Sequence, residues 1–184
     1  MLYIIHPGSR SIMVTEQATI TNRNTDLTIP YSLSPKPSGQ YFCICLIEAK
    51  DRLNLGSILR LAVNFKANAV FLVRCRYRRV QTDTLHATHQ LPIIELNEIP
   101  RILECTYVHV DFCENAENLI KFQHPKRAMY IFGGEDRTLI PNDSIESEHI
   151  VYIPTVGSCN LAVSVGILLY DRLTKLSKHH KFMN

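Results

Sequence analysis

Asn54 and Arg60 are the first residues whose types and spacing suggest chemistry. Asn54 lies just before a stretch, 55–65, in which apolar residues recur at helical spacing, and Arg60 lies inside it. Arginine is a permanent cation whose planar donors suit a phosphate group. A separation of six residues does not place two side chains on one helix face, so they would share a site only if Asn54 lies in the loop before the helix. The simpler interpretation is that Asn54 caps the helix and Arg60 is solvated.

Two glycines and an acid follow a second apolar stretch. Residues 129–132 are a predicted strand, and Gly133, Gly134 and Glu135 come directly after it. Paired glycines allow a sharp turn or a close approach of the backbone to a ligand. Ligands of open α/β sheets bind beyond the carboxyl ends of the strands. The segment is therefore either a ligand-binding loop or a plain turn.

A third segment connects a strand to a long helix. Residues 150–153 are the predicted strand, and a helix is predicted over 160–176. Ser158 and Asn160 lie where this helix begins, and either side chain could cap it. Capping alone would explain the presence of both residues.

The elements that must position these segments alternate between strand and helix. This alternation predicts an α/β fold with a mostly parallel sheet flanked by helices. Residues 1–39 are rich in Thr, Asn, Ser and Pro and are interpreted as an N-terminal arm or short hairpin, followed by a single domain over 40–184. Strands are predicted over 41–48, 69–73, 92–96, 107–110, 129–132 and 150–153, and helices over 55–65, 97–103, 116–122 and 160–176.

The last predicted helix is apolar almost all round. Between residues 161 and 170 only Ser164 and Gly166 interrupt the apolar side chains. A helix of this kind is buried on all sides. In a chain of 184 residues, that indicates a deep core position or a subunit interface.

The formal net charge of +3 is too small to indicate a nucleic-acid partner, so the placement of the charges matters more. Four arginines follow the strand that ends at residue 73, with Tyr77 among them. Arginines that alternate with an aromatic residue suit phosphate contact and base stacking, although a solvated charged loop would look the same. The predicted RNA-binding residues are Arg74, Arg76, Arg78 and Arg79, and a weaker candidate is the tail with Lys175, Lys178, His179, His180 and Lys181.

Several classes of protein are disfavoured by what the sequence lacks. The six cysteines form no CxxC pair and no cluster with zinc spacing, so we expect no metal and reduced core thiols. No run of about 18 apolar residues is present, so we expect no membrane span and a cytoplasmic protein. Neither GxGxxG nor GxxxxGK[ST] occurs, which disfavours Rossmann and P-loop nucleotide enzymes. Cys159 has no suggested His partner, which disfavours a cysteine nucleophile.

The three segments, in this order, resemble the three motifs of the SpoU-type RNA methyltransferases of the SPOUT superfamily. The resemblance covers about residues 41–175. Asn54, Gly56 and Arg60 match the first motif, 132–135 the second, and Ile153, Pro154, Ser158 and Asn160 the third. The chain departs from the common pattern at Arg52, Lys66, Asp136, Thr138 and Thr155, and the loop before Ser158 is short, which bears on how tightly the cofactor is held.

The resemblance implies a C-terminal trefoil knot whose loops bind S-adenosylmethionine, and a homodimer that shares its active site across the interface. It implies that the cofactor lies against Gly133, Gly134, Glu135, Ile153, Pro154, Thr155 and Leu161. It assigns the catalytic roles to Arg60, Asn54, Glu135, Ser158 and Asn160.

The expected activity is S-adenosylmethionine-dependent methylation of a ribose 2′-hydroxyl in RNA. We favour tRNA as the substrate because Ser-Cys-Asn-Leu at 158–161 is similar to the small tRNA-modifying branch, and because the chain has no room for an extra N-terminal RNA-binding domain. The alternatives are rRNA as the substrate, or a non-catalytic RNA-binding protein on the same scaffold.

Overall fold

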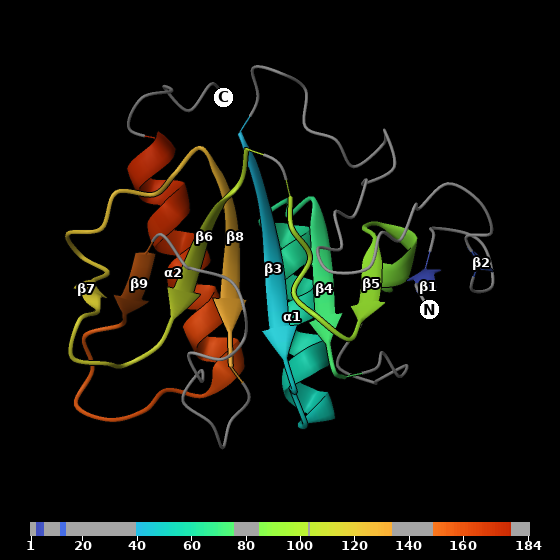
Figure 1. Cartoon of the computed structure of the whole chain (residues 1–184), viewed down its shortest axis with the longest axis horizontal. Coiled ribbons are helices and arrows are strands. Elements are labelled where there is room, and N and C mark those ends of the chain that lie inside the picture. Colours follow the sequence, from blue (N-terminus) through green and yellow to red (C-terminus); the bar gives the residue numbers. More distant parts are fainter. Residues whose placement is uncertain are drawn as a thin grey trace.

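The computed structural model describes residues 3–5, 12–13, 40–75, 85–102, 104–133 and 149–177, with only the backbone at 3–5 and 12–13. Its centre is a nine-stranded sheet in the order β2-β1-β5-β4-β3-β8-β6-β9-β7 (Figure 1). The strands from β5 to β7 in this order pair in parallel, and β1 and β2 extend the β5 edge in antiparallel pairing. The strands are β1 Tyr3–Ile5, β2 Ile12–Met13, β3 Tyr41–Ile47, β4 Ala69–Val73, β5 Ile93–Leu96, β6 Thr106–Val110, β7 Glu117–Asn118, β8 Arg127–Phe132 and β9 His149–Tyr152.

The expected α/β class with a mostly parallel sheet is confirmed, and each of the six predicted strands is present. All five residues of β4 are buried, and β3 is buried except for one half-exposed residue. Strands that are covered on both faces require nearly continuous apolar runs, which is why these two stand out in the sequence. The strand order is consistent with the expected knot, but the connection over 134–148 lies outside the described residues.

Two of the predicted helices are wrong. Residues 97–102 form no helix, because Pro100 lacks an N–H and disfavours helical geometry in the residue before it. The hydroxyl of Tyr107 accepts a hydrogen bond from the Ile102 N–H (2.6 Å) and donates one to the Pro100 carbonyl (2.8 Å). Part of the predicted helix 116–122 is instead strand β7, followed by a turn in which Asn118 Oδ1 accepts from the Ile120 N–H (2.9 Å).

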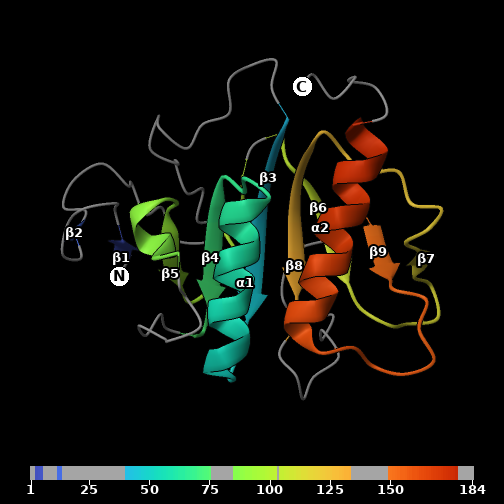
Figure 2. The same cartoon turned by 180° about the vertical axis from the view of Figure 1, so that it is seen from behind.

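Two long helices cover the same face of the sheet and lie side by side (Figure 2). They are α1, Arg52–Asn64, and α2, Leu161–Ser177, and a short 3₁₀ helix, η1, spans Ala87–His89. The two helices meet where Gly166 of α2 faces Leu61 of α1, and a Cβ added at Gly166 would lie at ordinary contact distance, 3.5 Å, from the Leu61 side chain. The opposite face of the sheet carries a second apolar cluster, to which Ile99, Ile102 and Cys105 contribute.

Helix α2 is less buried than the sequence indicates. Its sheet-facing side is in the core, but four large apolar side chains on its outer side are exposed. The expectation of burial on all sides is therefore wrong for the single chain. The exposed residues, which we call the α2 stripe, are Val163, Ile167, Tyr170 and Leu173.

A buried polar network anchors the second half of α2. His124 Nδ1 lies 2.7 Å from the Tyr130 hydroxyl, and its Nε2 lies 2.9 Å from Asp171 Oδ2, which also pairs with Lys175 (2.7 Å). Arg172 donates to the Pro125 carbonyl (2.6 Å) and to the Tyr130 hydroxyl (2.9 Å). Burial lowers the pKa of His124 to about 4, although Asp171 partly opposes the shift. The folded protein therefore holds His124 in its neutral form.

Candidate active site

The first turn of α1 is capped by Asp51. One oxygen of its carboxylate accepts hydrogen bonds from the N–H groups of Leu53 (2.7 Å) and Asn54 (3.4 Å). Asn54 is therefore not the cap that its type and position suggested, because the helix begins two residues before it, at Arg52. Its side chain is buried and is available for a contact outside its own helix.

That contact is with Asn160, at the start of α2. Asn160 Oδ1 accepts from the N–H groups of Ala162 (2.9 Å) and Val163 (3.4 Å), so this residue caps α2. Asn160 Nδ2 donates to Asn54 Oδ1 at 2.9 Å. A single amide therefore caps one helix and binds the other, and it joins the first and third chemical segments of the sequence across 106 positions.

Both helices begin at the edge of the sheet where the parallel strands end (Figures 1 and 2). Strands β3, β4 and β8 pair in parallel and point toward this edge. In open α/β sheets this is the edge at which ligands bind. The Asn54–Asn160 hydrogen bond thus lies at the expected place for a site.

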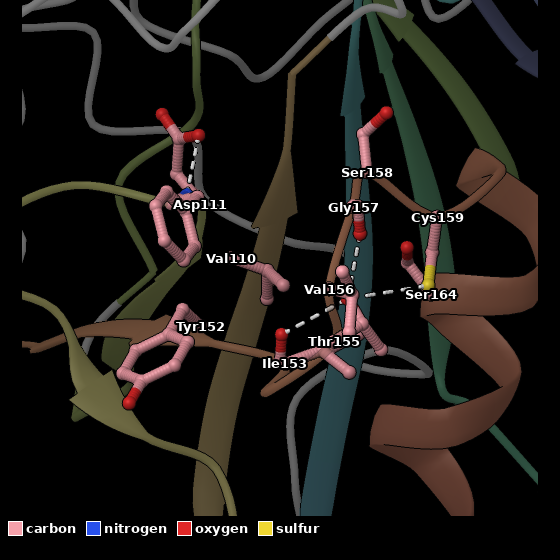
Figure 3. A pocket seen from close by; sticks show the side chains of 11 residues that line it. Val110, Asp111, Tyr152, Ile153, Thr155, Val156, Gly157, Ser158, Cys159 and Ser164 are labelled. Atoms are coloured by element: carbon pink, nitrogen blue, oxygen red, sulfur yellow. Dashed lines mark hydrogen bonds between the residues drawn. The ribbon is translucent and has the colours of Figure 1, made fainter.

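A cavity of about 320 Å³ lies at the same edge, and we call it the β6–β9 pocket (Figure 3). One wall follows the end of β6, and the other is the loop that connects β9 to α2. Its volume is within the range of small-molecule sites. The lining residues are Val110, Asp111, Phe112, Tyr152, Ile153, Thr155, Val156, Gly157, Ser158, Cys159 and Ser164.

The two walls differ in chemistry. On the β6 side, the rings of Phe112 and Tyr152 meet edge to face with centroids 5.6 Å apart, and Asp111 supplies a carboxylate. On the other side the loop is compact, because the Thr155 hydroxyl donates to the Gly157 carbonyl (2.7 Å). A Cβ on Gly157 would meet nothing within 4 Å. The pocket can therefore hold a flat apolar group on one side and polar groups against the backbone of the other.

A family model described as the SpoU rRNA Methylase family matches residues 41–170. The chain belongs to this family. The match covers the sheet from β3 onward, α1, and α2 as far as Tyr170, so it includes every element that borders the β6–β9 pocket.

Known proteins support this membership. A relative from Archaeoglobus fulgidus, an uncharacterized tRNA/rRNA methyltransferase, is 27% identical over 144 residues, which are 72% of this chain and 64% of the relative. An rRNA methyltransferase from Sinorhizobium meliloti, solved with AdoMet bound, has a TM-score of 0.65 at 22% identity, over 78% of this chain and 60% of that one. The chain thus spans less than two thirds of the length of these two proteins.

A smaller structure matches over nearly its whole length. Its subject is the 2-OH methylation of C/U34 on tRNA. The match has a TM-score of 0.61 at 20% identity. The matched part is 76% of this chain and 98% of that one. At these identities, the likeness to both solved structures shows the fold.

Residues expected to hold the cofactor are only partly brought together within this SpoU family member. Ile153 and Thr155 line the β6–β9 pocket, whereas Pro154 is exposed beside α2 and lines a separate groove. Leu161 is buried, and Gly133 comes directly after β8 without lining the pocket. Gly134 and Glu135 lie outside the described residues.

The expected catalytic residues also separate into groups. Ser158 lines the pocket, and Asn54 and Asn160 form the bond beside it. Arg60 is exposed on α1 and does not line the pocket. Among the predicted RNA-binding arginines, Arg74 pairs with Glu48 at 2.9 Å. Arg76, Arg78 and Arg79, and the tail from Lys178 to Lys181, lie outside the described residues; Lys175 pairs with Asp171.

The sequence did not reveal the β6 wall of the pocket. Asp111 and Phe112 come directly after a predicted strand, so the preference of ligands for the carboxyl ends of strands could have flagged them. Tyr152, inside β9, carried no such signal. What was missing is that β6 lies between β8 and β9, which brings residues 110–112 opposite the β9–α2 loop.

The described part of the chain has neither a metal-binding cluster nor a membrane-spanning helix. No group of three or more His, Cys, Asp or Glu side chains there could hold a metal ion. None of the helices described is both long enough and apolar enough to cross a membrane.

Proposed function

We propose that this protein transfers the methyl group of S-adenosylmethionine to a ribose 2′-hydroxyl of RNA, with tRNA as the favoured substrate. The observation that carries the proposal is the Asn160–Asn54 hydrogen bond beside the β6–β9 pocket. It places the first and third family motifs at one edge of the sheet, next to a cavity of suitable size.

The residues of the pocket fit this cofactor. Phe112 and Tyr152 offer an apolar aromatic surface for the adenine ring, and the open space at Gly157 lets the backbone approach a ligand closely. Asp111 supplies a negative charge, which favours a cationic sulfonium over a neutral thioether. When bound, the cofactor supplies a methyl group already activated by the positive charge on sulfur.

The protein must then position the ribose hydroxyl and assist the loss of its proton. Arg60 is the residue we assign to this task. Lowering the pKa of a guanidinium by five units would cost about 7 kcal/mol, so Arg60 acts as a cation and not as a base. In this role it holds a phosphate of the RNA and stabilises the alkoxide as it forms. Ser158, Asn54, Asn160 and Glu135 position the reacting groups around it.

The preference for tRNA has two supports. The chain matches 98% of the small structure whose subject is 2-OH methylation of tRNA, but only 60% of the rRNA methyltransferase from Sinorhizobium meliloti. The segment 158–161 also resembles the tRNA-modifying branch, as noted above. The alternative substrate is rRNA, and the assay must distinguish it from tRNA.

The test is a transfer assay with radiolabelled S-adenosylmethionine, using unmodified tRNA and rRNA transcripts in parallel. We expect label in tRNA, and mass spectrometry of the digested RNA should place it on a ribose. Label on a base would contradict ribose specificity, and label only in rRNA would contradict the tRNA preference. Cofactor binding without transfer to either RNA would contradict the enzymatic proposal.

Gly157→Val tests the cofactor pocket directly. The added side chain enters open space, so we expect folding stability within about 0.5 kcal/mol of the wild type. The same side chain occupies pocket volume, and we expect the calorimetric affinity for S-adenosylmethionine to fall at least about tenfold, or 1.4 kcal/mol. Thermal unfolding without ligand is the control. An unchanged affinity in a folded variant would place the cofactor elsewhere.

We also propose that the protein is a homodimer that buries the α2 stripe. Isolated exposed apolar residues are common, but four on one helix face form a contiguous patch of the kind found at interfaces. Light scattering should give twice the chain mass of 21.1 kDa. Ile167→Asp should give monomers, whereas Glu98→Lys, in the exposed loop that follows β5 in the other half of the sheet, should not. A wild-type monomer at micromolar concentration would contradict the proposal.

A further inference from the structure

We propose that a second cavity, at the ends of β3 and β4, binds a nucleotide of the RNA substrate that neighbours the methylated one. This inference rests on the proposed function. The cavity, which we call the β3–β4 pocket, has a volume of about 520 Å³. Its lining residues are Glu48, Ala49, Lys50, Asp51, Arg52, Leu55, Arg74 and Cys75.

Glu48 and Arg74 form one side of this pocket at equivalent positions of adjacent strands. Both have left-handed backbone geometry, with φ of 52° and 54°, which non-glycine residues rarely adopt. Backbone hydrogen bonds fix both turns, from the Glu48 N–H to the Val73 carbonyl (2.9 Å) and from the Arg74 N–H to the Leu96 carbonyl (2.8 Å). The carboxylate and the guanidinium meet at 2.9 Å, so Arg74 is held over the strand ends while 38% of its side chain stays exposed.

The pocket combines an apolar surface with positive charge. Ala49 and Cys75, which are partly exposed, provide an apolar surface on which a flat ring can lie, and the nearly fully buried Leu55 lies beneath it. Lys50, Arg52 and Arg74 provide three cations against two carboxylates, those of Glu48, which pairs with Arg74, and Asp51, which caps α1. A base beside a phosphate, the repeating unit of RNA, matches this combination.

The position of the pocket relates it to the cofactor site. Asp51, Arg52 and Leu55 line the β3–β4 pocket and surround Asn54 in the chain, while Ser158 and Cys159 line the β6–β9 pocket and precede Asn160. The Asn54–Asn160 bond therefore joins the two chain segments that line these cavities. An RNA strand with one nucleotide in the β3–β4 pocket can present the next ribose toward the cofactor side of that bond.

RNA explains the pocket better than an acidic peptide or a free phosphate. A phosphate alone makes no use of the apolar surface, and an acidic peptide has no base to place on Ala49 and Cys75. The occupant we commit to is a nucleotide within a single-stranded part of the RNA.

The first experiment measures the affinity of unmodified tRNA for the wild type, Lys50→Ala, Arg74→Ala and Lys126→Ala by fluorescence anisotropy. We expect about a tenfold loss for each pocket variant and a smaller dependence on salt, because each lost phosphate contact reduces the slope of log K against log salt by about 0.7 to 0.9. Lys126→Ala removes the same charge at the opposite edge of the sheet and should bind within about twofold of the wild type.

Calorimetry with S-adenosylmethionine on the same variants distinguishes a wrong assignment of the β3–β4 pocket from a wrong proposed function. Normal cofactor affinity with weakened tRNA binding in both pocket variants supports the pocket. Equal tRNA binding by all variants overturns it and leaves the proposed function intact. A wild type that binds neither tRNA nor the rRNA transcript overturns both the pocket and the enzymatic proposal.

A second experiment locates the RNA. Irradiation of tRNA that contains 4-thiouridine, followed by peptide mapping, should give crosslinks within residues 48–55 or at 74–75. Crosslinks confined to other segments would overturn the assignment. Uridine 5′-monophosphate at millimolar concentration should compete only weakly with tRNA; competition at micromolar concentration would show a site for free nucleotides and would also overturn it.

Discussion

Arg60→Ala is expected to reduce methyl transfer to RNA by at least about 100-fold, which is the usual cost of losing one group that stabilises a developing oxyanion. Arg60 is exposed on α1 and is not part of the β6–β9 pocket, so the affinity for S-adenosylmethionine should stay near that of the wild type. Single-turnover rates and calorimetry measure the two quantities separately. Arg60→Lys keeps the charge but loses the planar pair of donors, and we expect only a small recovery.

Arg101→Ala is the matched control, since it removes another exposed arginine from a loop away from both pockets. Its transfer rate should equal that of the wild type. If Arg60→Ala transfers methyl groups at the wild-type rate, the assigned role is wrong, and so is the mechanism built on it.

Mixing two impaired variants, at a cofactor concentration that the Gly157→Val pocket binds poorly, tests whether Arg60 serves its own chain or the partner. Helix α1 lies beside α2, whose exposed stripe is the proposed dimer interface, so we expect the Arg60 side chain to act on the partner subunit's pocket. A dimer of one Arg60→Ala chain and one Gly157→Val chain would then have one complete site, and mixing should restore activity. Without restoration in confirmed mixed dimers, Arg60 acts within its own chain.

The second large effect is a loss of folding stability at acid pH. His124 is fully buried with a pKa of about 4, against 6.5 for a free histidine, so the unfolded chain binds a proton that the folded chain does not bind between these pH values. Folding stability from this group is complete above pH 6.5 and is lost as the pH falls toward 4, by about 3 kcal/mol in total.

Other groups also titrate in this range, so the informative quantity is the difference in unfolding free energy between the wild type and a variant that lacks His124. His124→Gln cannot take up the proton, and the gap in unfolding free energy between wild type and variant should shrink by about 3 kcal/mol from pH 7 to pH 4. Urea unfolding at several pH values measures it. A gap that stays constant over this range would show that burial does not keep the imidazole neutral.

The sheet and both long helices could be read from the sequence because their signals are local. Each buried strand is a short apolar run, and α1 and α2 have apolar residues at helical spacing. The two wrong helices failed for specific reasons: Pro100 and the Tyr107 hydroxyl organise one segment, and Asn118 turns the other. Side-chain hydrogen bonds of this kind compete with helix formation, and the spacing of apolar residues does not reveal them.

The candidate site was less accessible to prediction, because its contacts join distant parts of the chain. The order of motifs indicated that Asn54 and Asn160 belong together, but not that one amide binds the other or that Asp51 takes the capping role. Exposure of Arg60 agrees with the simpler interpretation of the sequence, in which this side chain is solvated. The position of Asp111 and Phe112 in the pocket depends on the order of strands in the sheet, which no local pattern encodes.

The hydrogen bond between Asn54 and Asn160 also has a consequence for the order in which the protein matures during translation. Half of this contact and one wall of the β6–β9 pocket come from residues 152–164, which the ribosome makes after almost all of the sheet. Contacts between such distant residues form slowly, because a long loop must close first. In a nascent chain, α1 and most of the sheet are therefore present well before the β6–β9 pocket is complete. The chain can bind a methyl donor only after α2 has docked.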